Sequence, residues 1–284
     1  MNSKIDQNFG RIMVLVPHPD DEILMCAGIL AQAVQQGVDA FVVLVTNGDY
    51  EGQTDGKKRL QESLDSVAML GVPEKNVIFM GYADVGMAPT ESFLYGMYTD
   101  IEQHQIHPGH VGQTTYGLPH KPDYHSQVFG QPALYTRHQF LSDLGSILKE
   151  YQPENIFTTS VSDMHGDHSG LYLLLMEVLE EMKKQMAYVP RVFSGIVHSK
   201  DGDEHWPVRS EKLIPLTVPS CIQKEAKFLK GLEMFPVPDS MQQENKKDNL
   251  KYQALSCHKT ALKPDAVDFL YSFVKLDEIF WRMQ

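Results

Sequence analysis

Residues 17–22, with the sequence Pro-His-Pro-Asp-Asp-Glu, form the stretch of this chain best suited to chemistry. One imidazole (His18) and two carboxylates (Asp20 and Asp21) can supply both ligands and a base for a divalent metal ion. The alternative is structural, because Asp20 and Asp21 could simply cap a helix, where Asp is favoured. Glu22 is expected to be a first-turn carboxylate rather than a ligand. The combination of residues favours a metal site.

A second polar turn, His-Gly-Asp-His at residues 165–168, repeats this chemistry. If the strands before the two turns are neighbours, the turns can converge. His18, one aspartate of the first turn and one histidine of the second would then give three ligands and leave one position open. That arrangement is typical of catalytic rather than structural zinc sites. Alone, the second turn is equally compatible with solvated or core histidines, but the pair predicts a catalytic metal site.

The elements that must position these turns alternate between strand and helix patterns. Apolar, β-branched runs predict strands, and periodic runs closed by stop signals such as Gly71 and Pro73 predict helices. Strands separated by helices indicate βαβ crossovers, so we predict an α/β fold with a mainly parallel sheet in one domain, residues 1–284. The expected strands are 12–16, 39–46, 76–82, 155–161 and 191–198. The expected helices are 23–34, 57–70, 137–151, 171–185, 222–232, 250–256 and 266–273.

Residues 83–132 interrupt the pattern with many Gly, Pro, Tyr and His residues. A connection this long is usually functional, so we expect a lid or specificity loop. Its histidines lack a paired carboxylate turn and are expected to be solvated or to pack within the loop: His104, His107, His110, His120 and His125. Four aromatic residues could stack on a sugar, although such residues more often pack the loop itself: Tyr116, Tyr124, Tyr135 and Trp206.

Composition excludes several classes of function. With 25 Lys and Arg against 37 Asp and Glu, the net charge of -12 argues against nucleic-acid binding. The cysteines Cys26, Cys221 and Cys257 are far apart and offer neither a disulfide framework nor a thiolate zinc site. The first apolar run is too short for a signal peptide or a membrane span, so we expect a soluble cytoplasmic protein without an integral membrane segment.

The two turns together resemble the paired signatures of the LmbE/PIG-L family of zinc-dependent N-deacetylases. A third segment, Arg59-Leu60-Gln61-Glu62, resembles the R-x-x-E helix of that family. The resemblance covers the first half of the chain and resumes at 155–198. It implies a Rossmann-like sheet with helices on both faces, one zinc ion per chain, and removal of acetyl from a small N-acetylated amino sugar of the N-acetylglucosamine type. Relatives often assemble, which makes a homo-oligomer an open expectation.

The resemblance also implies roles for individual residues. Asp20 would be the general base, and His165 would be a protonated histidine that stabilises the oxyanion and protonates the leaving amine. Asp167 would pair with His165 and hold its imidazole charged. The implied zinc ligands are His18, Asp21 and His168.

Two further residues are candidates for substrate binding. Arg59 could bind substrate hydroxyls or an anionic group, and the alternative is an ion pair with Glu62 or Asp55. His198, at the end of the strand expected at 191–198, could line the site from its far side or be an ordinary, partly buried histidine.

Three alternatives to an N-acetyl amino sugar deacetylase stay open. One is a metal-dependent amidohydrolase for another N-acyl small molecule, and another is a non-catalytic carbohydrate- or metal-binding relative. A dinucleotide-binding protein is disfavoured, because the first turn lacks G-x-G-x-x-G and places carboxylates where phosphate would need free amides. A His/Asp/His site also accepts iron(II), cobalt or manganese, so the metal need not be zinc.

Overall fold

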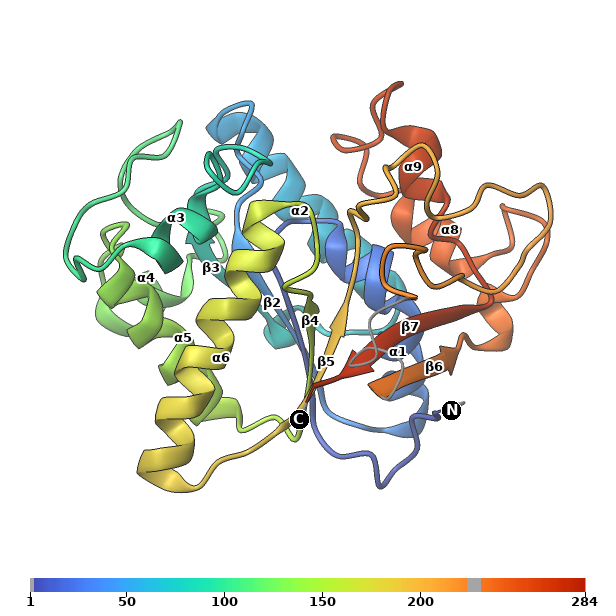
Figure 1. Cartoon of the computed structure of the whole chain (residues 1–284), viewed down its shortest axis with the longest axis horizontal. Coiled ribbons are helices and arrows are strands. Elements are labelled where there is room, and N and C mark those ends of the chain that lie inside the picture. Colours follow the sequence, from blue (N-terminus) through green and yellow to red (C-terminus); the bar gives the residue numbers. More distant parts are fainter. Residues whose placement is uncertain (1–2, 224–230, 284) are drawn as a thin grey trace.

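A seven-stranded sheet forms the centre of the computed structural model, which describes residues 3–223 and 231–283 (Figure 1). Its strand order is β3-β2-β1-β4-β5-β7-β6. Strands β1 to β5 are parallel, whereas β7 is antiparallel to both β5 and β6. The strands are β1 (Ile12–Val16), β2 (Ala40–Thr46), β3 (Val77–Tyr82), β4 (Asn155–Thr159), β5 (Arg191–Gly195), β6 (Leu232–Pro236) and β7 (Asp277–Arg282).

The strand order reverses between β1 and β4, and this reversal positions the two polar turns. β1 pairs with β2 on one side and with β4 on the other, and Leu15 lies opposite Thr158. The carboxyl ends of β1 and β4 therefore lie at the same edge of the sheet. In open α/β sheets, ligands bind in the crevice at such a point. The condition for convergence of the two turns, that their strands are neighbours, is met.

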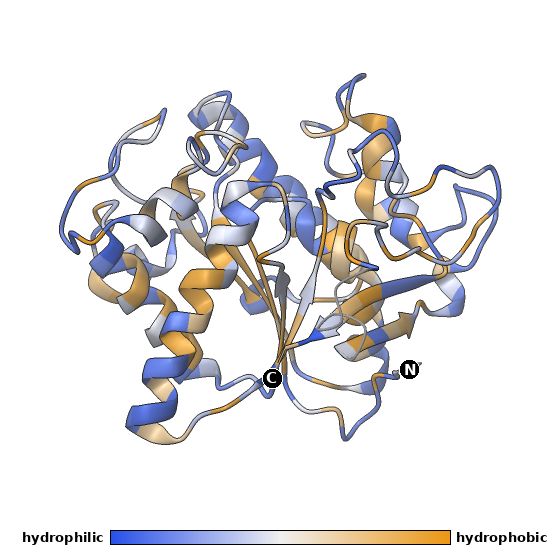
Figure 2. Ribbon diagram, viewed as in Figure 1, coloured by the Kyte–Doolittle hydropathy of each residue, from blue (hydrophilic) through white to orange (hydrophobic). Residues whose placement is uncertain are grey.

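Helices cover both faces of the sheet and bury two hydrophobic clusters. Along β1, Val14 and Val16 belong to one cluster and Met13 and Leu15 to the other, as the two-residue period of a strand requires. Figure 2 shows mostly hydrophobic central strands and largely hydrophilic outer loops. One cluster includes residues of α1 (Asp21–Gln36), α2 (Gln53–Met69), α8 (Leu250–Leu255) and α9 (Val267–Tyr271). The other includes residues of α3 (Phe93–Thr99), α4 (Tyr124–Phe129), α5 (Arg137–Tyr151) and α6 (Gly166–Met186).

The predicted α/β fold, with a mainly parallel sheet and helices on both faces, is confirmed. Helices α3 and α4 inside residues 83–132, and the antiparallel strands β6 and β7, were not predicted from the sequence. The helix expected at 222–232 lies largely outside the described residues, and Leu232 begins β6. Short 3-10 turns occur at η1 (Glu74–Asn76) and η2 (Asp239–Met241). Within residues 3–223 and 231–283, no helix combines the length and apolar character needed to cross a membrane.

Helix α3 packs directly onto the start of α6 because glycine leaves room for it. A Cβ atom on Gly170 would overlap the backbone nitrogen of Tyr95. This close approach lets the Leu94 backbone N–H donate a hydrogen bond of 2.7 Å to Asp167 Oδ1. The first helix of the long connection therefore orients a carboxylate of the second polar turn.

Candidate metal centre and active site

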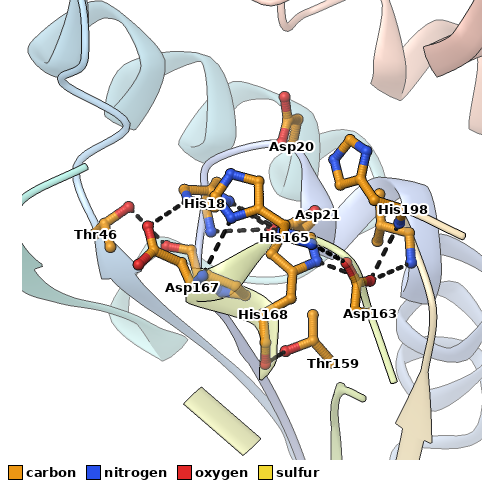
Figure 3. Close-up of polar contacts among 12 residues, drawn as sticks. His18, Asp20, Asp21, Thr46, Thr159, Asp163, His165, Asp167, His168 and His198 are labelled. Carbon is orange, nitrogen blue, oxygen red and sulfur yellow. Dashed lines mark hydrogen bonds and ion pairs between the residues drawn. The ribbon is translucent and has the colours of Figure 1, made fainter. Parts of the chain in front are cut away.

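The two polar turns face each other across the ends of β1 and β4 (Figure 3). His18 lies in the turn after β1, and Asp21 is the first residue of α1. His168 lies in the first turn of α6, which begins at Gly166, five residues earlier than the predicted start. All three side chains are buried. The fold thus brings the expected ligands together from two segments far apart in the sequence.

Three donor atoms form a nearly equilateral triangle. His18 Nδ1 lies 3.2 Å from His168 Nε2 and 3.4 Å from Asp21 Oδ2, and His168 Nε2 lies 3.3 Å from Asp21 Oδ2. Ligand atoms bound to tetrahedral zinc at about 2.0–2.1 Å are separated by about 3.3 Å. The triangle therefore fits three ligands of one zinc ion. Two looser groups of possible ligands have donor atoms that all lie within 4.8 Å of one another. One consists of His18, His165 and His168, and the other of His18, Asp84 and Asp167.

A carboxylate contacts the second ring nitrogen of each histidine in the triangle. Asp163 Oδ2 lies 3.1 Å from His168 Nδ1, and Asp167 Oδ2 lies 3.2 Å from His18 Nε2. Such carboxylate–histidine pairs fix the tautomer and the ring orientation of metal ligands. The sequence analysis gave Asp163 no role, although it lies in the polar segment that follows β4. Its side chain also accepts the backbone N–H groups of Val197 and His198, which ties the segment after β5 to the site.

The expectation that Asp167 pairs with His165 is wrong. The Asp167 carboxylate contacts His18 and the Leu94 backbone, whereas His165 receives only the Asp167 backbone N–H, at 3.2 Å from Nδ1. The reason is helical geometry. His165 is the N-cap of α6 and Asp167 its second residue, and residues two apart on a helix do not face each other.

Asp163→Asn is expected to weaken metal binding by about 10- to 100-fold, as loss of such supporting carboxylates commonly does. Both Asp163 oxygens accept N–H groups, so either orientation of an asparagine amide would point its own N–H at a donor. The measurement is the metal dissociation constant, from competition with a chelator. Asp203→Asn is the matched control, because Asp203 contacts His198 at 2.9 Å and no atom of the triangle. Equal affinity in the two variants would contradict the assignment.

The surrounding charges favour a bound cation. Burial lowers the pKa of His18, but Asp84, Asp167 and Asp21 outweigh it and raise the pKa to about 10. Burial likewise lowers the pKa of His168, yet Asp163 and Asp21 raise it well above its usual value. For Asp21, burial raises the pKa, but the two imidazoles lower it well below the usual range. The negative potential that would protonate these histidines also attracts a divalent metal ion.

Asp20 stands apart from the triangle and has an unusual backbone conformation. In Figure 3 its side chain lies away from the histidine cluster. Its φ of 123° is in a region that costs a non-glycine residue about 1–3 kcal/mol and persists only where the surroundings enforce it. Burial raises the pKa of its carboxyl, Arg59 lowers it, and the result is about 6. A carboxylate with these properties is suited to accept a proton near neutral pH.

Arg59 holds the Asp20 turn in place. Its NH2 group donates to Pro19 O at 2.8 Å and to Asp20 Oδ2 at 3.2 Å, and its NH1 group donates to Gly48 O at 3.1 Å. The alternative of an ion pair with Glu62 or Asp55 is therefore wrong. Arg59 borders the cavity described below, and its role in binding substrate stays a prediction.

The surroundings of His165 disfavour the charged form of its imidazole. Its ring centroid lies 4.5 Å from that of His18 and 4.8 Å from that of His168. Burial and the neighbouring imidazoles lower its pKa far below the usual value. Because Nδ1 accepts the Asp167 backbone N–H, the neutral ring carries its proton on Nε2. Among the described residues, no carboxylate forms a hydrogen bond or an ion pair with the His165 ring, so the expected charge-holding partner is not present there.

A cavity of about 390 Å³ opens above the triangle. His198 lines it, as one of its two interpretations predicted, and stacks on Phe269 with ring centroids 5.1 Å apart. The long connection 83–132 contributes only Asp84 and Met87 to the described lining. A large part of the lining comes from residues 260–270, for which no site role was predicted from the sequence. That the connection acts as a lid or specificity loop stays a prediction.

The other histidines and aromatic residues considered from the sequence do not line this cavity. His107 contacts Asp100 at 3.0 Å, and His125 contacts Asp143 at 2.8 Å, as expected for residues that pack the connection. Three of the four aromatic candidates for sugar stacking are buried elsewhere: Tyr124, Tyr135 and Trp206. The fourth, Tyr116, donates to Asp49 at 2.9 Å. The aromatic residues in the lining are instead Tyr50 and Phe269.

A protein-family model and several curated proteins match this chain. A family model described as PIG-L, GlcNAc-PI de-N-acetylase, matches residues 13–179. The 1D-myo-inositol 2-acetamido-2-deoxy-alpha-D-glucopyranoside deacetylase of Mycobacterium sp. (strain JLS) is 27% identical over 194 residues, covering 68% of this chain and 56% of that protein. Diacetylchitobiose deacetylase of Thermococcus kodakarensis is 27% identical over 142 residues, covering 45% of this chain and 51% of that protein.

Structural comparison supports the same fold. N,N'-diacetylchitobiose deacetylase from Pyrococcus horikoshii superposes with a TM-score of 0.55 at 17% identity, covering 96% of this chain and 84% of that one. The chain spans about half the length of the curated relatives it matches. Because the family model covers more than half of the chain and includes both polar turns, the chain belongs to the PIG-L family.

Proposed function

We propose that this protein is a zinc-dependent hydrolase that removes the acetyl group from an N-acetylated amino sugar. The observation that carries the proposal is the donor triangle beside Asp20, a carboxylate that lines the same cavity but belongs to no pair of the triangle. A protein that only binds metal or carbohydrate has no need of a strained aspartate there. The substrate class comes from relatives named as deacetylases of acetamido sugars.

The proposed ligands are His18, Asp21 and His168, one zinc ion per chain. A zinc ion held there polarises the amide carbonyl and lowers the pKa of a water molecule towards neutrality. Asp163 and Asp167 keep the two imidazoles in the orientation and tautomer that present Nε2 of His168 and Nδ1 of His18 to the ion. Iron(II), cobalt or manganese would be compatible with the same donors.

Asp20 is the proposed general base. Its carboxylate accepts a proton from the attacking water as the new oxygen–carbon bond forms. When the carbon–nitrogen bond breaks, the same proton passes to the leaving nitrogen. Acetic acid and an amine are the products, and at neutral pH the acid gives its proton to the amine, so that acetate and an ammonium group are released. Arg59 keeps the carboxylate in the cavity through its hydrogen bond to Oδ2.

His165 is proposed to stabilise the oxyanion as a neutral hydrogen-bond donor. Its Nε2–H is the ring donor left for substrate, because the Asp167 backbone uses Nδ1. A preorganised donor aimed at developing negative charge is commonly worth about 10²- to 10³-fold in kcat. This differs from the charged histidine that the family resemblance implied.

The test combines metal analysis with product analysis. Purified protein should contain one divalent metal ion per chain and should release acetate from a panel of N-acetyl amino sugars, including N-acetylglucosamine and diacetylchitobiose. Removal of the metal with a chelator should abolish acetate release, and added zinc should restore it. Metal binding without acetate release, across sugars and other N-acyl amides, would favour the non-catalytic alternative.

The cavity predicts a preference for substrates without negative charge. Besides Asp20 and Asp21, five carboxylates line it: Glu51, Asp55, Asp84, Asp203 and Asp265. The two basic residues of the described lining are paired, Arg59 with Asp20 and Lys263 with Glu51 at 3.3 Å. The negative potential should repel anions, so kcat/KM for a neutral amino sugar should exceed that for its 6-phosphate by at least about tenfold at low salt.

Ionic strength provides the control for this preference. Added salt screens charges over about 10 Å at 0.1 M, so the difference between the two substrates should narrow as salt is raised. Asp265→Asn removes one negative charge at an exposed position of the lining and should also reduce the difference in kcat/KM between the two substrates. A 6-phosphate that reacts as fast as the neutral sugar at low salt would contradict the prediction.

A further inference from the structure

A buried cluster outside the donor triangle links the C-terminal part of the chain to Asp20. The side chains of Glu22, Ser66 and His258 are fully buried. His258 Nε2 lies 3.0 Å from Ser66 Oγ and 3.3 Å from Glu22 Oε1. These residues come from α1, from α2 and from the turn after α8, so three separate segments meet at one carboxylate.

Glu22 uses its second oxygen to hold the backbone of Asp20. The Asp20 N–H donates to Glu22 Oε2 at 2.8 Å, and the Asp20 carbonyl accepts from Ile23 and Leu24 at 2.9 Å each. Asp20 has a φ of 123°, which a non-glycine residue adopts only when its surroundings impose it. The hydrogen bond from its N–H is the contact that ties this conformation to the buried cluster.

The R-x-x-E segment of α2 completes the arrangement. Arg59 donates to Pro19 O and to the Asp20 carboxylate. One turn further along, Glu62 accepts the Thr260 backbone N–H at 3.0 Å and its hydroxyl at 2.9 Å. Glu62 therefore holds the turn that carries His258. Arg59 holds Asp20, the residue whose backbone His258 contacts through Glu22.

We propose that His258 is a positioning residue that, through Glu22, fixes the backbone conformation placing the Asp20 carboxylate in the cavity. The role rests on Asp20 acting as the base of the proposed hydrolase. His258 and Thr260 lie outside residues 13–179, the part of the chain matched by the family model. The C-terminal segment thus supplies a support for the reacting carboxylate that the two polar turns do not contain.

His258→Ala is expected to lower kcat by about 10- to 100-fold, because displacement of a reacting group by about 1 Å can cost that much. KM and metal content should stay at the wild-type level, because the His258 side chain contacts Ser66 and Glu22, which neither line the cavity nor belong to the donor triangle. His258→Gln should recover most of the kcat, since its amide N–H can replace the Nε2–H that reaches Glu22. A merely structural role would lower the amount of folded enzyme and would leave kcat per metal-loaded molecule unchanged.

His125→Ala is the matched control. His125 is also a buried histidine paired with a carboxylate, 2.8 Å from Asp143, but it lies in α4 away from the cavity. His125→Ala should lower the melting temperature of the protein without the decrease in kcat that is expected for His258→Ala. The proposal is overturned if His258→Ala keeps kcat within about twofold of wild type, or if His125→Ala lowers kcat equally. If His258→Ala does not fold, Glu62→Gln weakens the docking of the same turn without removing volume from the core. Because Glu62 also holds Thr260 of the cavity lining, the φ angle of Asp20 is the readout for this variant, and an unchanged φ would overturn the proposal.

A crystal structure of His258→Ala separates this proposal from the proposed function. The φ angle of Asp20 is expected to leave its positive range in that variant and to return to it in His258→Gln. A changed φ in a protein whose wild type releases no acetate would reject the deacetylase and retain the positioning role. An unchanged φ, with an active wild type, would reject the positioning role alone.

Discussion

Asp20→Asn is expected to lower kcat for acetate release by about 10²- to 10⁴-fold, the usual contribution of a general base. The asparagine amide has the same size, and asparagine tolerates positive φ better than most residues, so the backbone at φ 123° should be preserved. Its oxygen can still accept the hydrogen bond from Arg59. The change therefore removes the proton acceptor and little else.

Steady-state kinetics and metal analysis on the same preparation check this result. Metal content should stay at one ion per chain, because Asp20 belongs to no pair of the donor triangle. Asp55→Asn is the matched control, because Asp55 also lines the cavity but pairs with Lys58 at 2.8 Å. It should retain activity within a few-fold of wild type. Near-normal turnover by Asp20→Asn would assign the proton transfer to another group.

His168→Ala is expected to abolish metal binding and with it all measurable acetate release. The variant removes one corner of the triangle and leaves Asp163 and Asp21 buried without the imidazole between them. Metal content, measured by elemental analysis after dialysis, should fall from about one ion per chain to background. A catalytic zinc site has only three protein ligands, so no spare donor can replace the one that is lost. The free energy of unfolding should fall as well, because a buried carboxylate loses its partner.

His198→Ala tests whether the loss of metal is specific to removal of a histidine of the donor triangle. His198 lines the same cavity, with its ring centroid 5.4 Å from that of His168, but it donates to Asp203 rather than forming part of the triangle. This variant should keep its metal ion. Retention of a full ion by His168→Ala would instead favour one of the looser donor groups, such as His18 with Asp84 and Asp167.

The local elements of this site could be predicted from the sequence, but their contacts could not. The apolar run before His18 and the polar turn after it identify β1 and the site edge of the sheet. Periodicity cannot show that β4 lies next to β1, because that pairing joins residues more than a hundred positions apart. Asp163 was missed for the same reason. Its importance depends on where the turn after β4 directs its carboxylate.

The two main errors have distinct physical causes. The family resemblance implied that Asp167 pairs with His165, whereas the start of α6 at Gly166 turns their side chains apart. The strands β6 and β7 were missed because charged residues interrupt their apolar pattern, Glu233 in β6 and Asp277 and Glu278 in β7, and because β6 is only partly buried at the edge of the sheet. Neither has the strong, continuous apolar pattern that identified the parallel strands.

The part of the lining formed by residues 260–270 has a consequence for how the proposed activity could diversify. The proposed metal donors and the proposed base lie within residues 18–168, whereas much of the cavity lining comes from a segment nearly a hundred residues later. Mutations there can reshape selectivity while the reacting groups stay intact. Exchanging that short segment between related chains, with His258 and Thr260 retained, is therefore a direct route to enzymes with altered substrates.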